Sequence, residues 1–491
     1  MARRVLPGRA WAKAVTRREL GKLAGATAIA PLIWAAKARA SQLPKLPRLS
    51  EAEALLLEPT DPRYARYQPA FNKRVILQPK LRAVCRTPAA VATLVDWARS
   101  NDLAFALRSG GHSFEGFSQS ADVVIDTREM TGIAIDPASN RITVGAGTSL
   151  GAIYKFLAPR GLVLPAGSCP TVGISGHTLG GGYGLLARPL GLSSDSLLAI
   201  DLVDPEAKQI TVGPADRPDL FWACRGGGGG TFGAATRYTF QVYRQQTILT
   251  FRYSWLLPAE RALRLFKAWQ AWSPKAPDPI TASLIVGRSG KLCSLRCFGQ
   301  STGPRGHLMS EAKALLDVEA PARPPLVAEA PFIDAVNFFA GPHPDESTYS
   351  KGKSDIVERP LGDDGIAALL DGILTFPDGA AVAICDPYGG AISRVAGDAT
   401  AFAHRGGSLY SIQYYTGWAD PRLSDERLAA MRKLYASLRP YMTGAAYVNY
   451  CDLDLADWQT AYWGANLARL IRVKAAFDPD NVFRHAQGVP V

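Results

Sequence analysis

At 491 residues the chain is too long for one ordinary hydrophobic core, so its length predicts two or three domains. Hydrophobic residues make up 47% of the chain and charged residues 20%, which excludes an intrinsically disordered protein. Most of the formal charge of +12 comes from residues 1–40, which contain nine basic residues and one acidic residue. The small excess of positive charge in the rest of the chain argues against a nucleic-acid partner.

Residues 1–40 have the three parts of an export signal. A basic region is followed by a moderately apolar stretch, and residues 38–40 give the small-x-small pattern that precedes cleavage. The paired Arg17 and Arg18 resemble the twin-arginine export motif. The alternative is a membrane anchor, but Pro31 interrupts a run that is shorter than the roughly 20 residues needed to span a bilayer. We therefore expect an exported protein, periplasmic or secreted, whose mature chain has no membrane span.

After a proline-spaced N-terminal segment over 41–69, the chain alternates short apolar runs with stretches of helical spacing. Residues 82–88 predict a strand, 89–102 predict a helix with apolar residues on one face, and 103–111 predict a strand that ends at glycines. Hairpin-like and helical pieces continue this β-α-β pattern. Together they predict an α+β domain over 70–245.

The character of the chain then changes to longer strands and amphipathic helices. Residues 280–287 and 291–300 are typical of strands, and the whole stretch 246–435 predicts a second α+β domain. The last segment, 436–491, combines a strand-like piece with a helix that ends before Asp478. No long linker separates the two domains, so we expect a ligand-binding cleft between them.

The cysteines and most histidines give no sign of a metal or redox centre. Seven cysteines are an odd number for an exported chain, so at least one is unpaired, and no C-x-x-C pair is present. Most of them are expected to be small buried residues. Four histidines show no metal-like spacing: His307, His343, His404 and His485. We therefore predict no metal site.

Two glycine-rich turns carry reactive side chains. The segment "RSGGHS", residues 108–113, contains His112, and the segment "AGSCPTVGISGHTLGGGYG", residues 166–184, contains Cys169. Glycines let backbone N–H groups approach a ligand closely and can cradle phosphate. The glycine runs match neither a lysine-containing P-loop nor the dinucleotide fingerprint. Glycine content alone therefore leaves a phosphate cradle and simple turns as equal alternatives.

These turns, with "DLFWACRGGGGGTFG" at 219–233, "YVNYCDLDL" at 447–455 and "YWGANLARLIRVKAAFDPDNVFR" at 462–484, resemble the motifs of berberine-bridge-enzyme-like FAD-linked oxidases. That family belongs to the vanillyl-alcohol-oxidase, or PCMH-type, FAD-binding superfamily. The resemblance implies an α+β fold with a two-subdomain FAD-binding domain and a substrate domain built on an antiparallel sheet covered by helices. It also implies that the C-terminal segment returns to the FAD-binding domain.

The resemblance further implies an FAD that is bound covalently at two points. The imidazole of His112 would be bonded to the 8α-methyl group and the sulfur of Cys169 to ring carbon 6. Imidazole and thiolate are nucleophilic enough near neutral pH for such bonds. Alone, His112 would be read as a turn histidine and Cys169 as a buried thiol. His177 is expected to belong to the flavin pocket or to the packing. The other predicted cofactor-binding residues are Arg108, Ser109, Gly110, Gly111, Ser113, Gly167, Val172, Gly173, Gly176, Gly182, Tyr183, Gly184, Gly233, Asn449 and Asn466.

A tyrosine is the expected base. In alcohol-oxidising members of the family a Tyr-x-Asn-Tyr segment supplies it, which here makes Tyr450 the candidate. Without the family context, Tyr450 would be read as a packed strand tyrosine. In the family that the chain resembles, a valine three residues after the linking cysteine goes with the use of oxygen, so the resemblance implies an oxidase from Val172. Val172 is also a plausible packing residue.

We therefore expect an oxidase that removes hydride from a CH–OH group of a carbohydrate or related alcohol and forms hydrogen peroxide. One alternative is oxidation of a secondary metabolite at a C–N or benzylic carbon, or by oxidative cyclisation, with a carboxylate base. Another is a flavin-carrying binding protein. The oligomeric state is not predicted. Aromatic residues of the second domain fit either a substrate site or a core: Trp255, Trp269, Trp272, Phe338, Phe339, Tyr414 and Tyr415.

Overall fold

The computed structural model describes residues 43–245, 247–340 and 347–491. The chain divides into two units, 1–46 and 47–491, and the helices and sheets given below belong to the second. The predicted export signal, residues 1–40, lies outside the described residues. None of the helices in the described part of the chain is both long enough and apolar enough to cross a membrane.

The β-α-β unit that the sequence predicts is confirmed. β2 (Leu81–Cys85) is buried along its whole length, as expected of a strand covered on both faces. α2 (Pro88–Ser100) begins where the Thr87 side chain accepts a hydrogen bond from a first-turn amide, with a proline at the first helical position. β3 (Phe105–Arg108) follows, so the loop that carries His112 leaves the end of this strand.

The first sheet has the strand order β1-β2-β4-β3. β4 (Val123–Asp126) lies between β2 and β3 and runs parallel to both. β1 (Ala54–Leu57) pairs antiparallel with β2 and is followed by the short helix α1 (Tyr64–Tyr67). Since β1 lies within residues 41–69, this N-terminal segment forms part of the first sheet.

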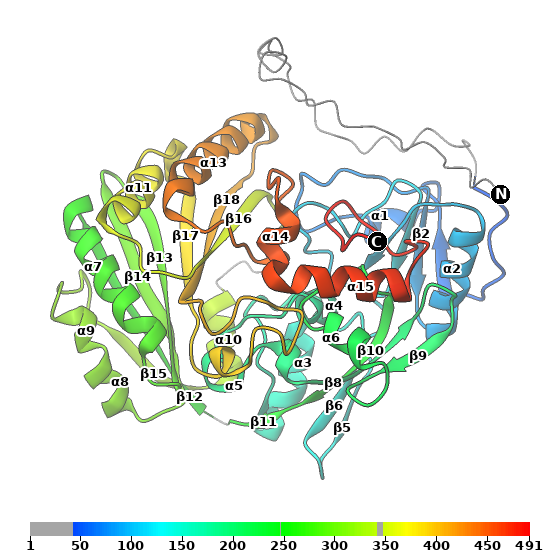
Figure 1. Cartoon of the computed structure of the whole chain (residues 1–491), viewed down its shortest axis with the longest axis horizontal. Coiled ribbons are helices and arrows are strands. Elements are labelled where there is room, and N and C mark those ends of the chain that lie inside the picture. Colours follow the sequence, from blue (N-terminus) through cyan, green and yellow to red (C-terminus); the bar gives the residue numbers. More distant parts are fainter. Residues whose placement is uncertain (1–42, 246, 341–346) are drawn as a thin grey trace, which may run out of the picture. The chain divides into compact units, whose positions relative to one another are not determined.

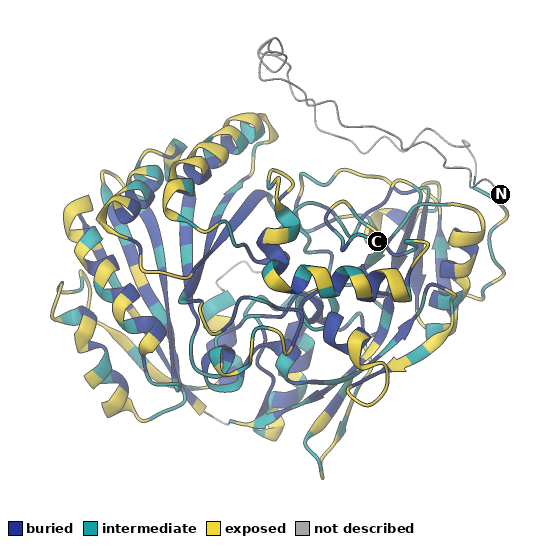
Figure 2. Ribbon diagram, viewed as in Figure 1, coloured by how far each residue is buried: buried dark blue, intermediate teal, exposed yellow. Residues whose placement is uncertain are grey.

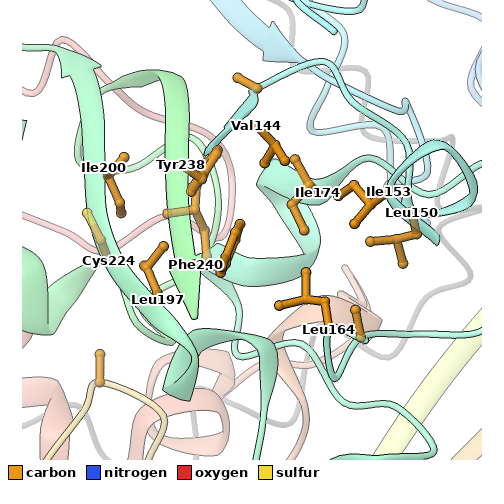
Figure 3. Packing of buried hydrophobic residues seen from close by; sticks show 14 of the residues in the cluster. Val144, Leu150, Ile153, Leu164, Ile174, Leu197, Ile200, Cys224, Tyr238 and Phe240 are labelled. Atoms are coloured by element: carbon orange, nitrogen blue, oxygen red, sulfur yellow. The ribbon is translucent and has the colours of Figure 1, made fainter. Parts of the chain in front are cut away.

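A second, antiparallel sheet has the strand order β5-β6-β10-β8-β9. Its strands are β5 (Ile133–Asp136), β6 (Arg141–Gly145), β8 (Leu197–Val203), β9 (Gln209–Val212) and β10 (Ala234–Gln241). A short ribbon pairs β7 (Leu162–Val163) with β11 (Tyr243–Arg244). The helices of this region are α3 (Leu150–Leu157), α4 (Ile174–Leu179), α5 (Ala187–Leu190) and α6 (Pro218–Ala223). Figure 3 shows their shared core, which includes Val144, Ile174 and Tyr238.

The third sheet has seven antiparallel strands in the order β15-β12-β14-β13-β17-β18-β16. Its strands are β12 (Thr247–Leu257), β13 (Ile280–Ser289), β14 (Leu292–Ser301), β15 (Leu326–Pro331), β16 (Tyr349–Val357), β17 (Ala381–Pro387) and β18 (Tyr410–Trp418). Three helices cover one face (Figure 1), namely α7 (Ala259–Trp272), α11 (Asp363–Leu374) and α13 (Ser424–Leu438). The shorter helices are α8 (Arg305–Glu311), α9 (Lys313–Leu316), α10 (Phe332–Ala340) and α12 (Ala391–Arg394). This confirms the predicted antiparallel sheet covered by helices.

The C-terminal segment packs into the core of the second sheet, as expected. It contains α14 (Trp458–Trp463) and α15 (Leu467–Phe477). Leu470 of α15 is fully buried in the same hydrophobic cluster as the strands β6 and β10. A buried ion pair of 2.6 Å between Lys474 Nζ and Asp478 Oδ2 ties the end of α15 to the turn that follows it.

The buried side chains form separate large clusters, one around the second sheet and one between the third sheet and its helices. In Figure 2 the strands of the third sheet are mostly buried, whereas the helices that cover it have exposed positions along their length. The cysteines agree with the sequence reading, since all seven are unpaired and all except Cys169 are buried. No group of three or more potential metal ligands exists among the described residues. The two clusters are separate, so the region between the second and third sheets is the expected place for a ligand.

Candidate active site

A cavity of about 690 Å³ lies between the glycine-rich turns and the third sheet. A volume of this order is typical of sites for cofactors and small ligands. The turns after β3 and β7 form one wall, and side chains of β13, β14, β17 and β18 form the opposite wall. Every predicted site residue lines this cavity except Gly182 and Asn466.

The turn after β3 presents an open row of backbone donors. In the part of the chain that the structure describes, the N–H groups of Gly110, Gly111, His112 and Ser113 donate no hydrogen bond to another protein group. Gly111 has a φ of +73°, a conformation that L side chains rarely adopt. Successive free amides of this kind form a nest for an anion such as a phosphate.

The imidazole of His112 is neutral in this environment. Its ring stacks on Phe71 with centroids 4.0 Å apart, and it hydrogen-bonds to the backbone of Thr171. Burial, with a smaller contribution from the charge of Arg108, lowers the pKa of His112 to about 4. One ring nitrogen thus donates to Thr171 while the other keeps a lone pair.

The two predicted turns touch each other directly. A Cβ added at Gly110 would lie 2.3 Å from the backbone nitrogen of Gly173, so only glycine fits where the turns meet. Ser109 Oγ and Ser175 Oγ both donate to the carbonyl of Ala146, at 2.7 and 2.6 Å, and so hold both turns to one point. This contact brings the Cys169 turn beside the His112 turn.

Cys169 is the partly exposed cysteine of the chain and lies on the cavity wall, with its Sγ 3.6 Å from Thr171 Oγ1. Cys451 also lines the cavity, but burial raises the pKa of its thiol to about 11. The accessible thiol of this site is therefore Cys169.

Three side chains brace the turn around His177. His177 Nε2 accepts a hydrogen bond from the amide of Gly167 at 3.1 Å, and burial lowers its pKa to about 4. The Asn449 amide donates to the carbonyl of His177 at 2.9 Å and to the Tyr447 hydroxyl at 2.9 Å. His177 is therefore a neutral pocket residue, as the sequence suggested, and Asn449 fixes its backbone.

Two predicted contacts need correction. Gly182 does not line the cavity, because its amide is turned to the hydroxyl of Tyr447 at 3.0 Å. Asn466 is also absent from the cavity wall, and its amide donates to the carbonyls of Gly397 and Thr400 at 2.7 and 3.1 Å. Gly182 thus shapes the turn, and Asn466 fixes a loop behind the site.

Tyr450 faces the cavity with an unused hydroxyl. Tyr447 is its neighbour, with ring centroids 4.9 Å apart, but the hydroxyl of Tyr447 already accepts three hydrogen bonds. The hydroxyl of Tyr450 has no hydrogen-bond partner among the described residues. Burial, followed by the charge of Asp386, raises the pKa of Tyr450 well above its ordinary value. Of the two tyrosines in this segment, Tyr450 is therefore the one free to act on a ligand.

The opposite wall contains a carboxylate that sequence reasoning missed. Asp386, on β17, lines the cavity, and its Oδ1 accepts a hydrogen bond from Ser283 Oγ at 2.8 Å. Burial raises the pKa of Asp386 to about 6. A lone carboxylate in the otherwise apolar stretch "AVAICDP" was the available signal, since charged groups are rarely buried without a role.

The same face of the sheet supplies further lining residues. Gln413 lies opposite Ile384 in the strand register, and Phe298, Phe339 and Tyr415 add aromatic surface. Among the aromatic residues that the sequence singled out, Phe339 and Tyr415 line the cavity. Trp255, Trp269 and Tyr414 belong instead to the core beneath the sheet, and Trp272 packs against it, while Phe338 lies outside the wall and contacts Phe339.

Comparison with known proteins agrees with this architecture. A family model described as FAD binding domain matches residues 79–213, and one described as Berberine and berberine like matches 446–490. The fold and the cavity therefore define an FAD-linked oxidoreductase with a PCMH-type FAD-binding domain. The chain belongs to the berberine-bridge-enzyme-like family of these oxidoreductases.

Relatives from bacteria and plants match most of the chain. The FAD-linked oxidoreductase YgaK of Bacillus subtilis is 34% identical over 88% of this chain and 95% of its own length. Monolignol oxidoreductase AtBBE-like 13 of Arabidopsis thaliana is 33% identical over 80% of each chain. The structure of BBE-like 1 from Physcomitrella patens has a TM-score of 0.83 at 31% identity, covering 90% of this chain and 97% of its own. Berberine bridge enzyme from Eschscholzia californica has a TM-score of 0.82 at 26% identity, covering 89% of this chain and 96% of its own.

The residues of the cavity fit an FAD. The free amides of 110–113 are suited to its diphosphate, and the glycines at 228–230 give a second stretch of cavity wall without side chains. The glycine contact between Gly110 and Gly173 leaves no room for side chains that would fill the cradle. The uncharged imidazole of His112 and the accessible thiol of Cys169 lie on this same wall.

Proposed function

We propose that this protein is an FAD-dependent oxidase that carries its flavin on two covalent links, through His112 and Cys169. It oxidises a CH–OH group of a carbohydrate or related alcohol and uses oxygen as the electron acceptor, with release of hydrogen peroxide. The observation that carries the proposal is that one cavity is lined by a neutral imidazole, an accessible thiol and a tyrosine with a free hydroxyl.

The chain prepares both attachment residues for bond formation. His112 donates one ring N–H to the backbone of Thr171, which leaves the lone pair of the other nitrogen as the nucleophile. Cys169 lies on a partly exposed turn, where its thiol is accessible to a ligand in the cavity. The contact between Gly110 and Gly173 fixes the two turns, so both residues address the same ligand.

Tyr450 and Asp386 are proposed to handle the substrate proton together. The bound FAD supplies the acceptor for the hydride. A tyrosine with a strongly raised pKa is not a standing phenolate, so Tyr450 has to release its own proton as it takes one from the substrate hydroxyl. Asp386, with a pKa of about 6, is ionised at neutral pH, and after burial its charge makes the largest contribution to the raised pKa of Tyr450. We assign it as the final proton acceptor.

The sheet wall suits an alcohol with a flat or ring-shaped body. Phe298, Phe339 and Tyr415 offer aromatic faces, and Gln413 offers an amide with no hydrogen-bond partner among the described residues. Sugars and aromatic alcohols both bind through such a combination. The name of the Arabidopsis relative, a monolignol oxidoreductase, supports an alcohol as the donor.

Asp386 is also the observation that favours the second candidate, oxidation of a secondary metabolite at a C–N or benzylic carbon. That chemistry uses a carboxylate as its base, and one berberine bridge enzyme structure is described in complex with (S)-reticuline. In that case Asp386 would act without Tyr450. The Tyr450→Phe variant therefore separates the two candidates, since only alcohol oxidation requires the phenol.

The proposal is tested with a panel of sugars, aromatic alcohols and amines, scored by oxygen uptake and peroxide release. We expect at least one alcohol to give peroxide in equal amount to the oxygen consumed, and Tyr450→Phe to abolish it. Oxidation of amines alone, unaffected by Tyr450→Phe, would contradict the proposal. Substrate-dependent bleaching of the yellow colour without oxygen uptake would contradict the assignment as an oxidase.

A further inference from the structure

Two lysines on the edge strand β16 are buried together with their carboxylate partners. Lys351 and Lys353 are about 2% and 1% exposed. Lys351 Nζ pairs with Glu115, and lies 2.6 Å from Asp452 Oδ1. Lys353 Nζ lies 2.6 Å from Asp452 Oδ2. Lysines are almost never buried unless they are paired, so the carboxylate partners are what allow these two lysines to be buried.

The carboxylates of this cluster belong to the two loops that carry the proposed chemistry. Glu115 follows His112 by three positions, and Asp452 follows Tyr450 by two. Within the described residues, Lys351 is the one side chain that forms ion pairs with both loops.

The loops also meet each other at the cavity wall. Ser113 Oγ lies 3.7 Å from Cys451 Sγ, and the rings of Phe114 and Tyr450 are in edge contact with centroids 6.0 Å apart. These contacts are weak and polarisable, so they do not fix the distance between the loops by themselves. The ammonium of Lys351 supplies the strong connection just behind them.

A buried network of this kind is a poor source of stability. Removing charges from water costs free energy that the ion pairs repay only in part, and apolar replacements are often as stable. Burial alone would lower the pKa of Lys351, but the carboxylates of Glu115, Asp452 and Asp454 outweigh it and raise that pKa. Lys351 therefore stays charged, and what the network provides is a fixed geometry.

We infer that Lys351 is a positioning residue that holds the loop of His112 against the loop of Tyr450. The inference rests on the function proposed above. Its ammonium pairs with Glu115 of the first loop and with Asp452 of the second, so the attachment residue and the base keep one relative position. It touches neither cofactor nor substrate, since it does not line the cavity.

The first arm of the test needs no substrate. In a Cys169→Ala background, where the His112 link is the single one left, purified protein is precipitated with acid and the colour retained by the chain is measured. Lys351→Met should reduce the attached fraction strongly, because a displacement of about 1 Å can slow a positioned reaction by about 100-fold. Lys351→Arg keeps the charge and should restore attachment.

The second arm measures turnover of the proposed alcohol substrate with Cys169 in place. Lys351→Met should lower kcat by about 100-fold per attached flavin and leave KM nearly unchanged, as expected when only the reacting geometry is lost. The matched control is Lys267→Met, which breaks an exposed ion pair of 2.6 Å with Asp363 and should change neither readout.

A double variant separates positioning from folding. Lys351→Met leaves Glu115 and Asp452 buried without their shared partner, whereas Lys351→Met with Glu115→Gln removes one charge of each sign. If the double variant unfolds at a lower temperature but keeps full attachment and full kcat, Lys351 is merely structural and the inference is overturned. Loss of attachment or of kcat in a folded double variant supports it.

The two proposals fail in different ways. If Cys169→Ala protein alone retains no colour in acid, the His112 link of the proposed function is wrong, and the kcat measurement decides the inference. If no alcohol is oxidised by the unchanged protein, the proposed donor class is wrong, and the measurement of flavin attachment then decides the inference about Lys351.

Discussion

The two walls of the cavity are built by different means. The wall of turns presents mainly backbone groups to the cavity. It includes the N–H groups of residues 110–113 and the close contact between Gly110 and Gly173. The wall of the third sheet offers side chains, among them Asp386 and Gln413, which stand on alternate positions of neighbouring strands. The first wall is suited to one fixed cofactor, and the second can be changed residue by residue without disturbing the sheet.

This difference predicts that the two walls of the cavity tolerate substitution to different degrees. A backbone wall tolerates few substitutions, because its donors and its glycine contacts are fixed by the path of the chain. A sheet face tolerates many, since each side chain points into the cavity from a scaffold held by hydrogen bonds elsewhere. Predictions that disturb one wall at a time therefore show whether the two are independent.

The largest expected effect on the reaction rate comes from a substitution in the loop of Tyr450, which belongs to neither of the two walls compared above. Tyr450→Phe should lower the rate of alcohol oxidation by about 1,000-fold, since it removes the group that we propose takes the substrate proton. KM should change little, and the retained colour should not change. Stopped-flow measurement of anaerobic bleaching gives the rate directly. Unaltered bleaching would show that another group takes the proton.

The next largest effect tests the backbone wall. In Gly173→Ala the new Cβ would lie 2.2 Å from Ser109 Oγ and 2.4 Å from the backbone nitrogen of Gly110. We expect a loss of ~3 kcal/mol in the free energy of unfolding and poor retention of flavin. Gly306→Ala is the control, because a Cβ there meets no atom within 4 Å. Equal stability of the two variants, measured by urea unfolding, would disprove the tight contact between the turns.

Asp386→Asn tests the sheet wall through pH. If Asp386 accepts the proton, the rate should fall as pH drops below about 6, where its carboxylate becomes protonated, and Asp386→Asn should remove this dependence. The rate of the variant at pH 8 should be about 10-fold to 100-fold lower. A pH–rate profile of anaerobic bleaching provides the measurement, and an unchanged acidic limb would exclude Asp386.

Asp386→Asn, which should lower the reaction rate, should at the same time raise the free energy of unfolding at pH 8. The folded state raises the pKa of Asp386 from 3.8 to about 6, so it binds the proton more tightly than the unfolded chain does. The stability that this group contributes is present below pH 3.8 and is lost as pH rises through about 6. Asp386→Asn should therefore be more stable than the unchanged protein at pH 8, by up to about 3 kcal/mol, and the advantage should vanish below pH 4. A constant difference across this range would contradict the raised pKa.

The smallest effect concerns oxygen. Val172 lines the cavity three residues after Cys169, and Val172→Leu adds bulk there. We expect reoxidation by oxygen to slow by about tenfold, or ~1.4 kcal/mol, with anaerobic bleaching unchanged. Mixing the bleached protein with oxygenated buffer measures the step alone. Equal reoxidation rates would assign Val172 to packing.

The residues that the sequence could place on the cavity wall are those that lie in short contiguous motifs. The turns around His112 and Cys169 are contiguous motifs, and the helical spacing before residue 103 identifies the β-α-β unit that delivers the first of them. The Tyr-x-Asn-Tyr segment singles out Tyr450 through the family resemblance, and the structure adds that the hydroxyl of Tyr447 already accepts three hydrogen bonds.

The residues that sequence reasoning missed or misplaced depend on contacts between distant segments. A lone carboxylate in an apolar stretch marks Asp386 as unusual, but the pairing of β17 with β18, which brings it into the site, cannot be read from the local sequence. Asn466 belongs to a matching motif, but the direction of its side chain is set by the loop at 397–401. Lys351 forms ion pairs with Glu115 and with Asp452, which lie in loops more than 300 residues apart in the sequence.

The most direct test of the account is mass spectrometry of peptides from the purified, yellow protein after proteolysis. We predict that the peptide containing His112 and the peptide containing Cys169 are recovered as one species, joined through a single flavin. If both peptides are recovered without any added mass, the proposed double attachment, and the chemistry built on it, is wrong.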